Sequence, residues 1–407
     1  MEQEINDNSF DESSKIEKTN APASNHKPYT LPASFLGSTG LGKCQVQPPE
    51  HLSPDSSLIE ILVFARQKQA TDIHISSEHP ILFRIFSKLV KQTEKCLSKM
   101  IIESLVVSIL TQEQLNAFQS KGDLELIYVV EGAGRFRITL MKKRLGLDLT
   151  VRLIPMQIPT FEQLGIPESC KELMKWTQGM ILIAGPIGCG KTTTLSTLIE
   201  MVNQQRKEHI ITIEDPIEIV FESKLAQISQ REINLHTLSQ DNALRAALRE
   251  DPDILVVSEL RDLSTIQLAA TAAETGHLVL GTMNTNDSIQ TILRIINSFS
   301  PDERSIVQNM ISESLRGIIC QQLVPKKDGS GVVPVYEALI VNNAVSNLIR
   351  KGNLDQLITI ITTGRAEGMI PFDASLRNLY ESGIISGSQA YERCFNKNEF
   401  EVCKNEN

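Results

Sequence analysis

The 407-residue sequence predicts an α/β protein, in which a smaller α+β domain is followed by a parallel sheet covered by helices on both faces. Three observations predict this fold. After residue 168, apolar runs typical of strands alternate with helical segments, as in parallel sheets. A glycine-rich motif joins one of these strands to the helix that follows it. Before residue 158, short strands and helices occur without that regular alternation.

Changes in composition divide the chain into six parts. Residues 1–53 are polar and rich in Ser, Asn, Pro, Glu and Lys, so they predict a disordered arm that cannot bury enough apolar area to fold. The other parts are a first domain at 54–157, a linker at 158–168, an α/β domain at 169–341, a helical region at 342–395 and a charged, frayed tail at 396–407.

The first domain is predicted from helical and alternating apolar segments. Helices are expected at 58–65, 100–110 and 111–118, and the last one opens with the capping box Thr111-x-x-Gln114. Strands are expected at 72–75, 81–85, 124–130, 134–140 and 147–153. This mixture without βαβ order indicates a small α+β domain.

The α/β domain is predicted from four strands and four helices in alternation. The strands are expected at 180–184, 210–214, 254–257 and 278–282, and the helices at 191–204, 238–250, 264–274 and 286–298. A glycine-containing turn at 328–331 leads into an apolar run at 332–336, which predicts a hairpin.

Composition excludes several classes of protein. The net charge of −9 argues against a nucleic-acid partner. The seven cysteines form no C-x-x-C pair, which argues against a zinc site or a disulfide framework. Because we find neither an apolar run of membrane-spanning length nor a signal peptide, we expect a cytoplasmic protein that reaches a membrane only through partners.

The glycine-rich motif fits the phosphate-binding loop Gly-x-x-x-x-Gly-Lys-[Ser/Thr], and it stands between a strand and a helix as that loop requires. Its backbone N–H groups can face a polyphosphate, Lys191 can bind the β- and γ-phosphates, and the Thr192 hydroxyl can ligate Mg²⁺. We therefore expect a nucleoside triphosphate to be bound by Gly185, Pro186, Ile187, Gly188, Cys189, Gly190, Lys191, Thr192 and Thr193.

Cys189 lies at the start of the helix and beside Lys191. A helix N-terminus and a nearby cation both favour the thiolate, so the sequence predicts a lowered pKa for this thiol. On this basis, thiol-modifying reagents are expected to block nucleotide hydrolysis, with bound ATP protecting. The alternative interpretation is that a small residue merely fits this position.

Acidic side chains follow two of the predicted strands. Glu259 comes after the strand at 254–257, with Ser258 where an Asp usually ends such a strand, and it is the candidate to deprotonate the attacking water. Alternatively, Glu259 is a carboxylate that stabilises a helix start. Glu214 and Asp215 end the strand at 210–214 and can position Mg²⁺, or they form an ordinary strand-exit turn before Pro216.

The predicted strand at 278–282 has polar residues at both ends. His277 precedes it, and Asn284 stands among the small polar residues that follow it. Such residues can sense a γ-phosphate, although a lone histidine is more often a structural hydrogen-bonding group. Both are candidate nucleotide contacts.

Together these elements resemble the hexameric ATPases of type IV pili and type II secretion, and most of all their pilus-retraction branch of the PilT and PilU type. The resemblance covers about residues 57–395. It includes the motifs at 70–74, 134–137, 212–218, 230–232, 246–253, 274–278, 347–352 and 368–373.

The resemblance implies a PAS-like first domain joined to a RecA-like ATPase core, with ATP and Mg²⁺ bound between domains of a six-membered ring. It implies catalytic roles for Lys191, Glu214 and Glu259, with Mg²⁺ near Thr192, Glu214 and Asp215. Arg135, Arg137 and Arg152 correspond to arginines that reach the triphosphate, some of them from a neighbouring subunit. In place of the second histidine of the family's His box, this chain has Asn284.

The function implied is an ATP-hydrolysing hexameric motor that powers pilus retraction and twitching motility through an inner-membrane platform protein. A paralogous pilus ATPase is a further expected partner, and the expected location is the cytoplasmic face of the inner membrane. Two alternatives stay open. One is an accessory ring subunit that binds ATP and hydrolyses it weakly, and the other is a type II or type IVB secretion ATPase. The absence of a four-cysteine insert favours the retraction branch.

Overall fold

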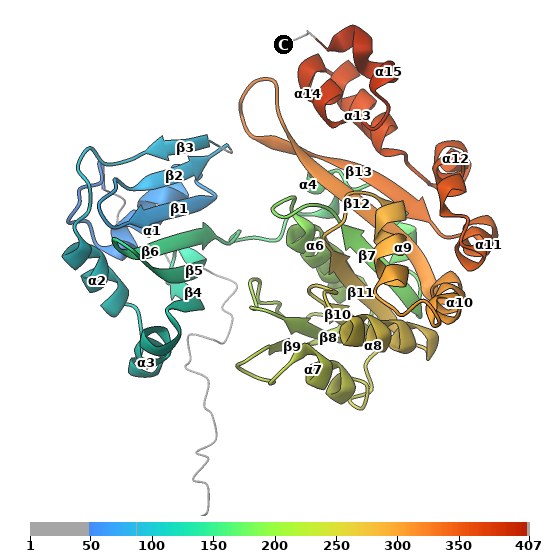
Figure 1. Ribbon diagram of the computed structural model, residues 1–407, viewed down its shortest axis with the longest axis horizontal. Helices are drawn as coiled ribbons and strands as arrows, with labels where there is room; N and C mark the ends of the chain where they lie inside the picture. The colour runs from blue at the N-terminus through green and yellow to red at the C-terminus, as the bar shows by residue number, and fades with distance from the viewer. Residues whose placement is uncertain (1–48, 87, 405–407) are drawn as a thin grey trace, which may run out of the picture. The chain divides into compact units, whose positions relative to one another are not determined.

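The computed structural model describes residues 49–86 and 88–404, which form two sheets with their helices (Figure 1). One sheet has six strands and the other has seven. The predicted arm lies outside the described residues except for 49–53, where Leu52 is buried in the core of the first domain. The folded chain therefore begins before the predicted boundary at residue 54.

The first domain is a six-stranded antiparallel sheet in the order β3-β2-β1-β6-β5-β4, accompanied by three helices. Its elements are α1 (Leu58–Gln67), β1 (Asp72–Ser76), β2 (Leu82–Ile85), β3 (Lys88–Lys91), α2 (Lys99–Val107), α3 (Gln112–Lys121), β4 (Asp123–Val130), β5 (Gly134–Lys143) and β6 (Gly146–Leu153). Ile61 of α1 packs with Ile73 and Phe136 of the sheet in one apolar cluster. The predicted capping box at Thr111 is confirmed.

The second sheet is parallel in six strands and ends in one antiparallel strand, in the order β13-β12-β7-β11-β10-β8-β9. Its elements are α4 (Phe161–Leu164), α5 (Ser169–Leu173), β7 (Gly179–Ala184), α6 (Lys191–Gln205), β8 (His209–Glu214), β9 (Gln227–Glu232), α7 (Gln240–Ala247), β10 (Ile254–Val257), α8 (Leu263–Glu274), β11 (Leu278–Met283), α9 (Ser288–Asn297), α10 (Arg304–Ser314), β12 (Leu315–Pro325) and β13 (Val332–Ile340).

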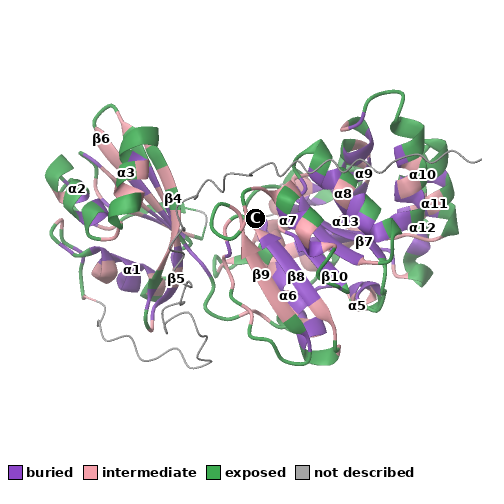
Figure 2. Ribbon diagram, turned by 90° about the horizontal axis from the view of Figure 1, so that it is seen from below, coloured by how far each residue is buried: buried purple, intermediate pink, exposed green. Residues whose placement is uncertain are grey.

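Helices cover both faces of this sheet, as the alternation predicts. Met180 and Leu182 of β7 face an apolar cluster that contains α7 to α12, whereas Ile181 and Ile183 face a second cluster with α4, α5 and α6. Strands β7 and β10 are therefore buried along their whole length (Figure 2). Strand β11 is buried in the same way. The predicted α/β class is confirmed.

Several elements of the fold are missing from the prediction, among them β3, β9, α10 and β12. Strand β3 is exposed at every residue, and β9 is a polar edge strand, so neither carries a run of buried apolar residues. Helix α10 and strand β12 follow each other without an intervening loop, which leaves no turn signal in the sequence. Strand β12 is the partner that completes the predicted hairpin with β13.

The segment predicted as a linker at 158–168 is packed and belongs to the α/β domain. It contains α4, and both Phe161 and Ile166 are buried in the same cluster as α6. After α5 comes Trp176, which is half exposed, and the guanidinium of Arg316 lies 4.6 Å from its ring centroid. A flexible connector would leave apolar side chains such as Phe161 and Ile166 in solvent, so this segment is part of the folded domain.

The C-terminal region is helical, with α11 (Asn343–Lys351), α12 (Leu357–Thr363), α13 (Phe372–Glu381), α14 (Gly387–Arg393) and α15 (Lys397–Phe400). The prediction of a frayed tail is wrong for residues 396–404. Phe400 and Cys403 are buried in one apolar cluster with Phe372 and Leu376, whereas the neighbouring residues Glu399 and Glu401 face solvent. None of the helices within residues 49–86 and 88–404 has the length and apolar character needed to cross a bilayer.

Candidate active site

The polar motifs predicted from the sequence meet at the carboxyl edge of the parallel sheet. Strands β7, β11, β10 and β8 are neighbours in that order, and Ala184 at the end of β7 pairs with Met283 at the end of β11. Val257 at the end of β10 pairs with Ile213 of β8. The segments that follow these strands are therefore brought to one edge, where open α/β sheets bind ligands.

The glycine-rich loop between β7 and α6 has the backbone that its glycines allow. Gly185, Gly188 and Gly190 all have positive φ angles, of 152°, 78° and 91°. A Cβ atom at Gly185 would lie 2.3 Å from the carbonyl oxygen of Gln321, so no other residue fits there. The Lys191 ammonium donates to the carbonyl oxygens of Gly185 and Pro186, at 2.8 and 3.0 Å.

Gln321 of β12 is a site residue that the sequence did not reveal. Its buried side-chain amide donates to the carbonyl oxygen of Cys189 at 2.7 Å and accepts from the Thr194 hydroxyl at 2.7 Å. It thus fastens the glycine-rich loop to the first turn of α6. No local signal could have identified it, because its role depends on the pairing of β12 with β7.

The prediction of a lowered pKa for Cys189 is wrong. Burial raises the pKa of this thiol, and the charge of Lys191 opposes that shift without overcoming it. The side chain is 3% exposed, packed under the loop instead of facing the solvent. Burial also lowers the pKa of Lys191, whereas the nearby Cys189 and Glu259 oppose that change.

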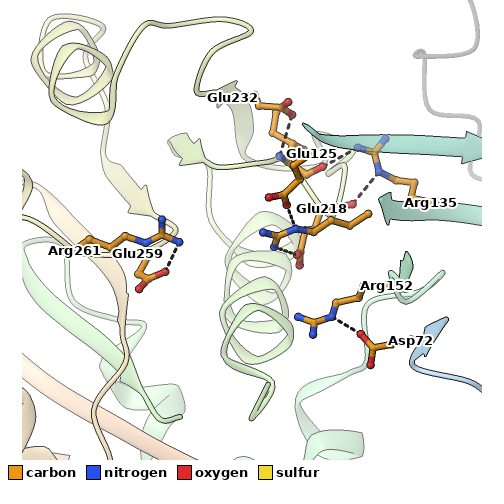
Figure 3. A network of polar contacts seen from close by, with 10 residues as sticks. Asp72, Glu125, Arg135, Arg152, Glu218, Glu232, Glu259 and Arg261 are labelled. Atoms are coloured by element: carbon orange, nitrogen blue, oxygen red, sulfur yellow. Dashed lines mark hydrogen bonds and ion pairs between the residues drawn. The ribbon is translucent and has the colours of Figure 1, made fainter. Parts of the chain in front are cut away.

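Glu259 follows β10, so it lies at the same carboxyl edge of the sheet as the glycine-rich loop that follows β7. The Asn284 amide donates to Glu259 Oε1 at 2.5 Å. Arg261 Nη2 lies 2.8 Å from Glu259 Oε2 (Figure 3). Gln240 donates to the backbone carbonyl oxygen of Glu259 at 2.9 Å. The roles of Arg261 and Gln240 were not predicted, because nothing in their local sequence marks them.

Glu214 and Asp215 end β8 in different surroundings. Asp215 is exposed, whereas the Glu214 Oε1 atom accepts from Thr212 at 2.7 Å and from Gln230 at 2.9 Å. Burial raises the pKa of Glu214 to about 7, because these two hydrogen bonds only partly offset the loss of water and the nearby carboxylates Glu218 and Glu232. Glu214 thus exchanges its proton near neutral pH.

Two of the three predicted arginines reach the segment that follows β8. Arg135 of β5 donates to the carbonyl oxygens of Glu218 and Ile217, at 2.9 and 2.8 Å (Figure 3). Arg137 of the same strand pairs with Glu218 at 3.1 Å and with Glu125. Arg152 of β6 stands opposite Arg137 in the pairing of β5 with β6, but its side chain pairs with Asp72 of the first domain at 3.0 Å.

The candidate nucleotide contact at His277 is wrong for a site within this chain. His277 immediately precedes β11, and its carbonyl oxygen accepts from the first residue of β7, Gly179, at 3.0 Å. It therefore lies at the amino edge of the sheet, whereas the glycine-rich loop lies at the carboxyl edge. Its ring contacts the carbonyl oxygen of Ala272 at 3.1 Å, in keeping with the structural alternative.

Comparisons with known proteins agree with this arrangement. The family described as Type II/IV secretion system protein matches residues 50–366. The type IV pilus retraction ATPase PilT of Pseudomonas aeruginosa is 39% identical over 336 residues, 83% of this chain and 97% of the relative. A twitching motility protein of Neisseria gonorrhoeae is 41% identical over 295 residues, 72% of this chain and 79% of the relative.

A solved structure shows the same fold. The crystal structure of the pilus retraction motor PilT with bound ADP superposes with a TM-score of 0.76 at 38% identity, covering 85% of this chain and 99% of that chain. The likeness thus extends over both sheets rather than over the glycine-rich loop alone.

Proposed function

Because this chain belongs to the type II/IV secretion system protein family, we propose that it is an ATP-hydrolysing motor that powers type IV pilus retraction. The single observation that carries this proposal is the position of Lys191, Glu259 and Glu214 at one sheet edge, in a chain similar over most of its length to pilus retraction ATPases. Hydrolysis of ATP is the energy source of the motor.

The glycine-rich loop is the triphosphate cradle. A Cβ at Gly188 would meet no atom within 4 Å, so the outer side of the loop is open to a ligand. Lys191 and the backbone N–H groups of the loop bind the phosphates, and Thr193 lies next to them. Thr192 is exposed at the first turn of α6 and offers its hydroxyl to Mg²⁺, with Glu214 and Asp215 acting through water.

These residues fit the cation. Mg²⁺ keeps several of its waters and takes few protein ligands, which suits one hydroxyl with carboxylates nearby. When bound, Mg²⁺ neutralises charge that develops on the phosphate oxygens. With a pKa of about 7, Glu214 is ionised above neutral pH, and the ionised carboxylate is the state that can hold the cation's waters.

Glu259 is the general base. Its carboxylate accepts a proton from the attacking water. The positive charge of Lys191 stabilises the negative charge of the phosphates during this step. Arg135, Arg137 and Arg152 contribute positive charge from the first domain, where some of them serve the site of a neighbouring subunit. Their hydrogen bonds to Glu218, Ile217 and Asp72 exchange for phosphate contacts when that site closes.

The working assembly is a homohexamer on the cytoplasmic face of the inner membrane. It turns an inner-membrane platform protein, and a paralogous pilus ATPase assists it. Closure of the first domain on the ATPase core converts phosphate binding into movement. This part of the proposal is supported by the overall likeness to a pilus retraction motor.

Steady-state hydrolysis of Mg-ATP by the purified full chain tests the enzymatic part, with Glu259→Gln as the matched variant. We expect the substitution to lower kcat by about 10²-fold or more, because it removes the general base. A wild-type rate equal to that of Glu259→Gln would favour the alternative of an accessory ring subunit.

Deletion of the coding sequence in its own host tests the cellular part. Loss of retraction predicts excess surface pili and no twitching motility, restored by the wild-type chain and not by Glu259→Gln. Normal pili combined with lost protein secretion would point to a secretion ATPase instead.

A further inference from the structure

Both carboxylate oxygens of Glu259 are occupied by side chains from different segments. Oε1 accepts from the Asn284 amide at 2.5 Å, and Oε2 faces Arg261 Nη2 at 2.8 Å. A carboxylate only accepts hydrogen bonds, so the amide nitrogen of Asn284 must be the atom that faces it. The amide of Asn284 is thus committed to the base, although the sequence marked it as a phosphate contact.

We propose that Asn284 is a positioning residue for hydrolysis, which aims the Glu259 carboxylate at the attacking water and does not bind the phosphates itself. This inference rests on the proposed role of Glu259 as general base. An amide suits the task because it donates a hydrogen bond without carrying a charge. A neutral donor therefore holds the carboxylate in place and adds no positive charge beside it.

The backbone on both sides of this hydrogen bond is fixed. Leu260 donates its N–H to the carbonyl oxygen of Thr282 at 2.9 Å, and the Thr282 hydroxyl donates to the carbonyl oxygen of Ser258. These bonds tie the residues around Glu259 to the end of β11. Asn284 is carried two residues further along, just after the fully buried Met283. The donor therefore stands on a rigid strand end.

The second partner of the carboxylate is less able to fix its direction. The Arg261 side chain is 60% exposed, whereas that of Glu259 is 23% exposed. An ion pair with one exposed partner is screened by salt and costs side-chain entropy, so it contributes little. Asn284 is the partner that holds the carboxylate, and Arg261 adds a minor restraint.

A comparison of kinetic and binding constants tests the assignment. Asn284→Leu removes the donor at similar size, and we expect kcat to fall by about 10- to 100-fold, because a base that is not aimed loses much of its effect. The dissociation constant for Mg-ATP, measured by calorimetry, should change by less than about twofold, since no phosphate contact is lost. The matched variant Arg261→Gln should lower kcat by less than about threefold.

The pH profile of kcat separates positioning from a purely structural role. Asn284→Asp has the same shape but sets a second carboxylate against Glu259, and such a pair retains a proton to higher pH. The acidic limb is the pH range in which kcat falls because the base becomes protonated. In Asn284→Asp this limb should move to higher pH by at least about one unit, whereas in Asn284→Leu it should not move. A structural defect would lower kcat at every pH and leave the limb unmoved in both variants.

Four outcomes would overturn the assignment. A loss of Mg-ATP affinity in Asn284→Leu as large as the loss of kcat/KM would make Asn284 a phosphate ligand. Unchanged kcat in that variant, or an unmoved acidic limb in Asn284→Asp, would show that the hydrogen bond does not serve the base. A wild-type rate no higher than that of Glu259→Gln would instead remove the proposed hydrolysis, and with it the base that Asn284 positions.

Discussion

Glu214 is a residue whose charge near neutral pH depends on its surroundings. It sits at the end of β8 with Thr212 and Gln230 on one oxygen, and burial raises its pKa from 4.5 to about 7. Between these values the folded chain binds a proton that the unfolded chain has released. Folding is therefore favoured at the acidic end of this range, and that advantage is lost as pH rises through 7.

We predict that this group adds about 3 kcal/mol to the unfolding free energy of the nucleotide-free protein below pH 4.5, and that this contribution is lost by the time the pH exceeds 7. Denaturant unfolding at a series of pH values measures this. Glu214→Gln is the matched variant, because its side-chain oxygen still accepts from Thr212 and it does not titrate. The difference between the two stability curves should grow with pH, and parallel curves would contradict the prediction.

The cysteines differ in how accessible their thiols are to solvent and reagents. Of the six within the described residues, Cys96 is exposed and the others are buried, including Cys189 beneath the glycine-rich loop. Because thiolate character and access set reactivity, we predict that iodoacetamide labels Cys96 well before Cys189. ATP hydrolysis should survive the first phase of labelling, and peptide mass spectrometry identifies the labelled site. Early labelling at Cys189 with loss of activity would restore the interpretation made from the sequence.

At the scale of elements, β12 connects the C-terminal part of the chain to the glycine-rich loop through Gln321. Replacing Gln321 by Leu leaves the Cys189 carbonyl and the Thr194 hydroxyl without their buried partner, which costs about 1–3 kcal/mol. We predict a lower melting temperature and an affinity for Mg-ATP weakened by about tenfold, since the loop is no longer held in its binding form.

Gln322→Leu is the control for this prediction. Gln322 is the next residue of β12, so its side chain points to the other face of the sheet. It should bind Mg-ATP as the wild type does. Equal affinity in Gln321→Leu and in the control would show that the loop holds its form without Gln321.

The elements that could be predicted are those whose own residues carry the signal. Strands β7, β10 and β11 are apolar runs, and the glycine-rich loop is a local motif, so sequence alone places them. Strand β9 pairs through its backbone at a sheet edge and keeps polar side chains, so nothing local distinguishes it from a loop. The C-terminal turn around Phe400 depends on packing against α13, which no local pattern encodes.

The residues of the candidate site also divide into those that a local motif marks and those whose role depends on contacts between distant segments. Lys191 and Glu259 are predictable because each stands in a motif next to a strand. Gln321 is not, because its role depends on a strand pairing that joins it to the loop across 132 positions of sequence. His277 was misassigned because the motif that contains it spans β11 from end to end, and only one end of a strand faces the site.

At the scale of the whole molecule, β5 of the first domain carries Arg135 and Arg137, which bond to the segment after β8. The proposed ring offers these arginines a second set of partners on a neighbouring subunit. Each site would then combine Glu259 of one chain with arginines of another. An arginine that serves a neighbouring subunit's site and one that serves the site of its own chain give opposite results when two kinds of inactive subunit are mixed.

We predict that Arg137→Ala lowers kcat by about 10³-fold, as expected for an arginine that stabilises transition-state charge. Mixing Arg137→Ala with Glu259→Gln subunits should then recover a measurable fraction of the wild-type rate, because some sites receive both intact residues. Wild-type subunits mixed with Glu259→Gln report whether subunits exchange. No recovery despite exchange would assign Arg137 to the site of its own chain.

The position of Trp176 has a practical consequence, since it is the single tryptophan of the chain. It lies between α5 and β7, with the Arg316 guanidinium over its ring. Tryptophan fluorescence therefore senses the amino edge of the parallel sheet, and the first domain contributes none of that emission. A melting curve recorded by this emission follows the ATPase core alone, and circular dichroism is needed to see when the antiparallel sheet melts.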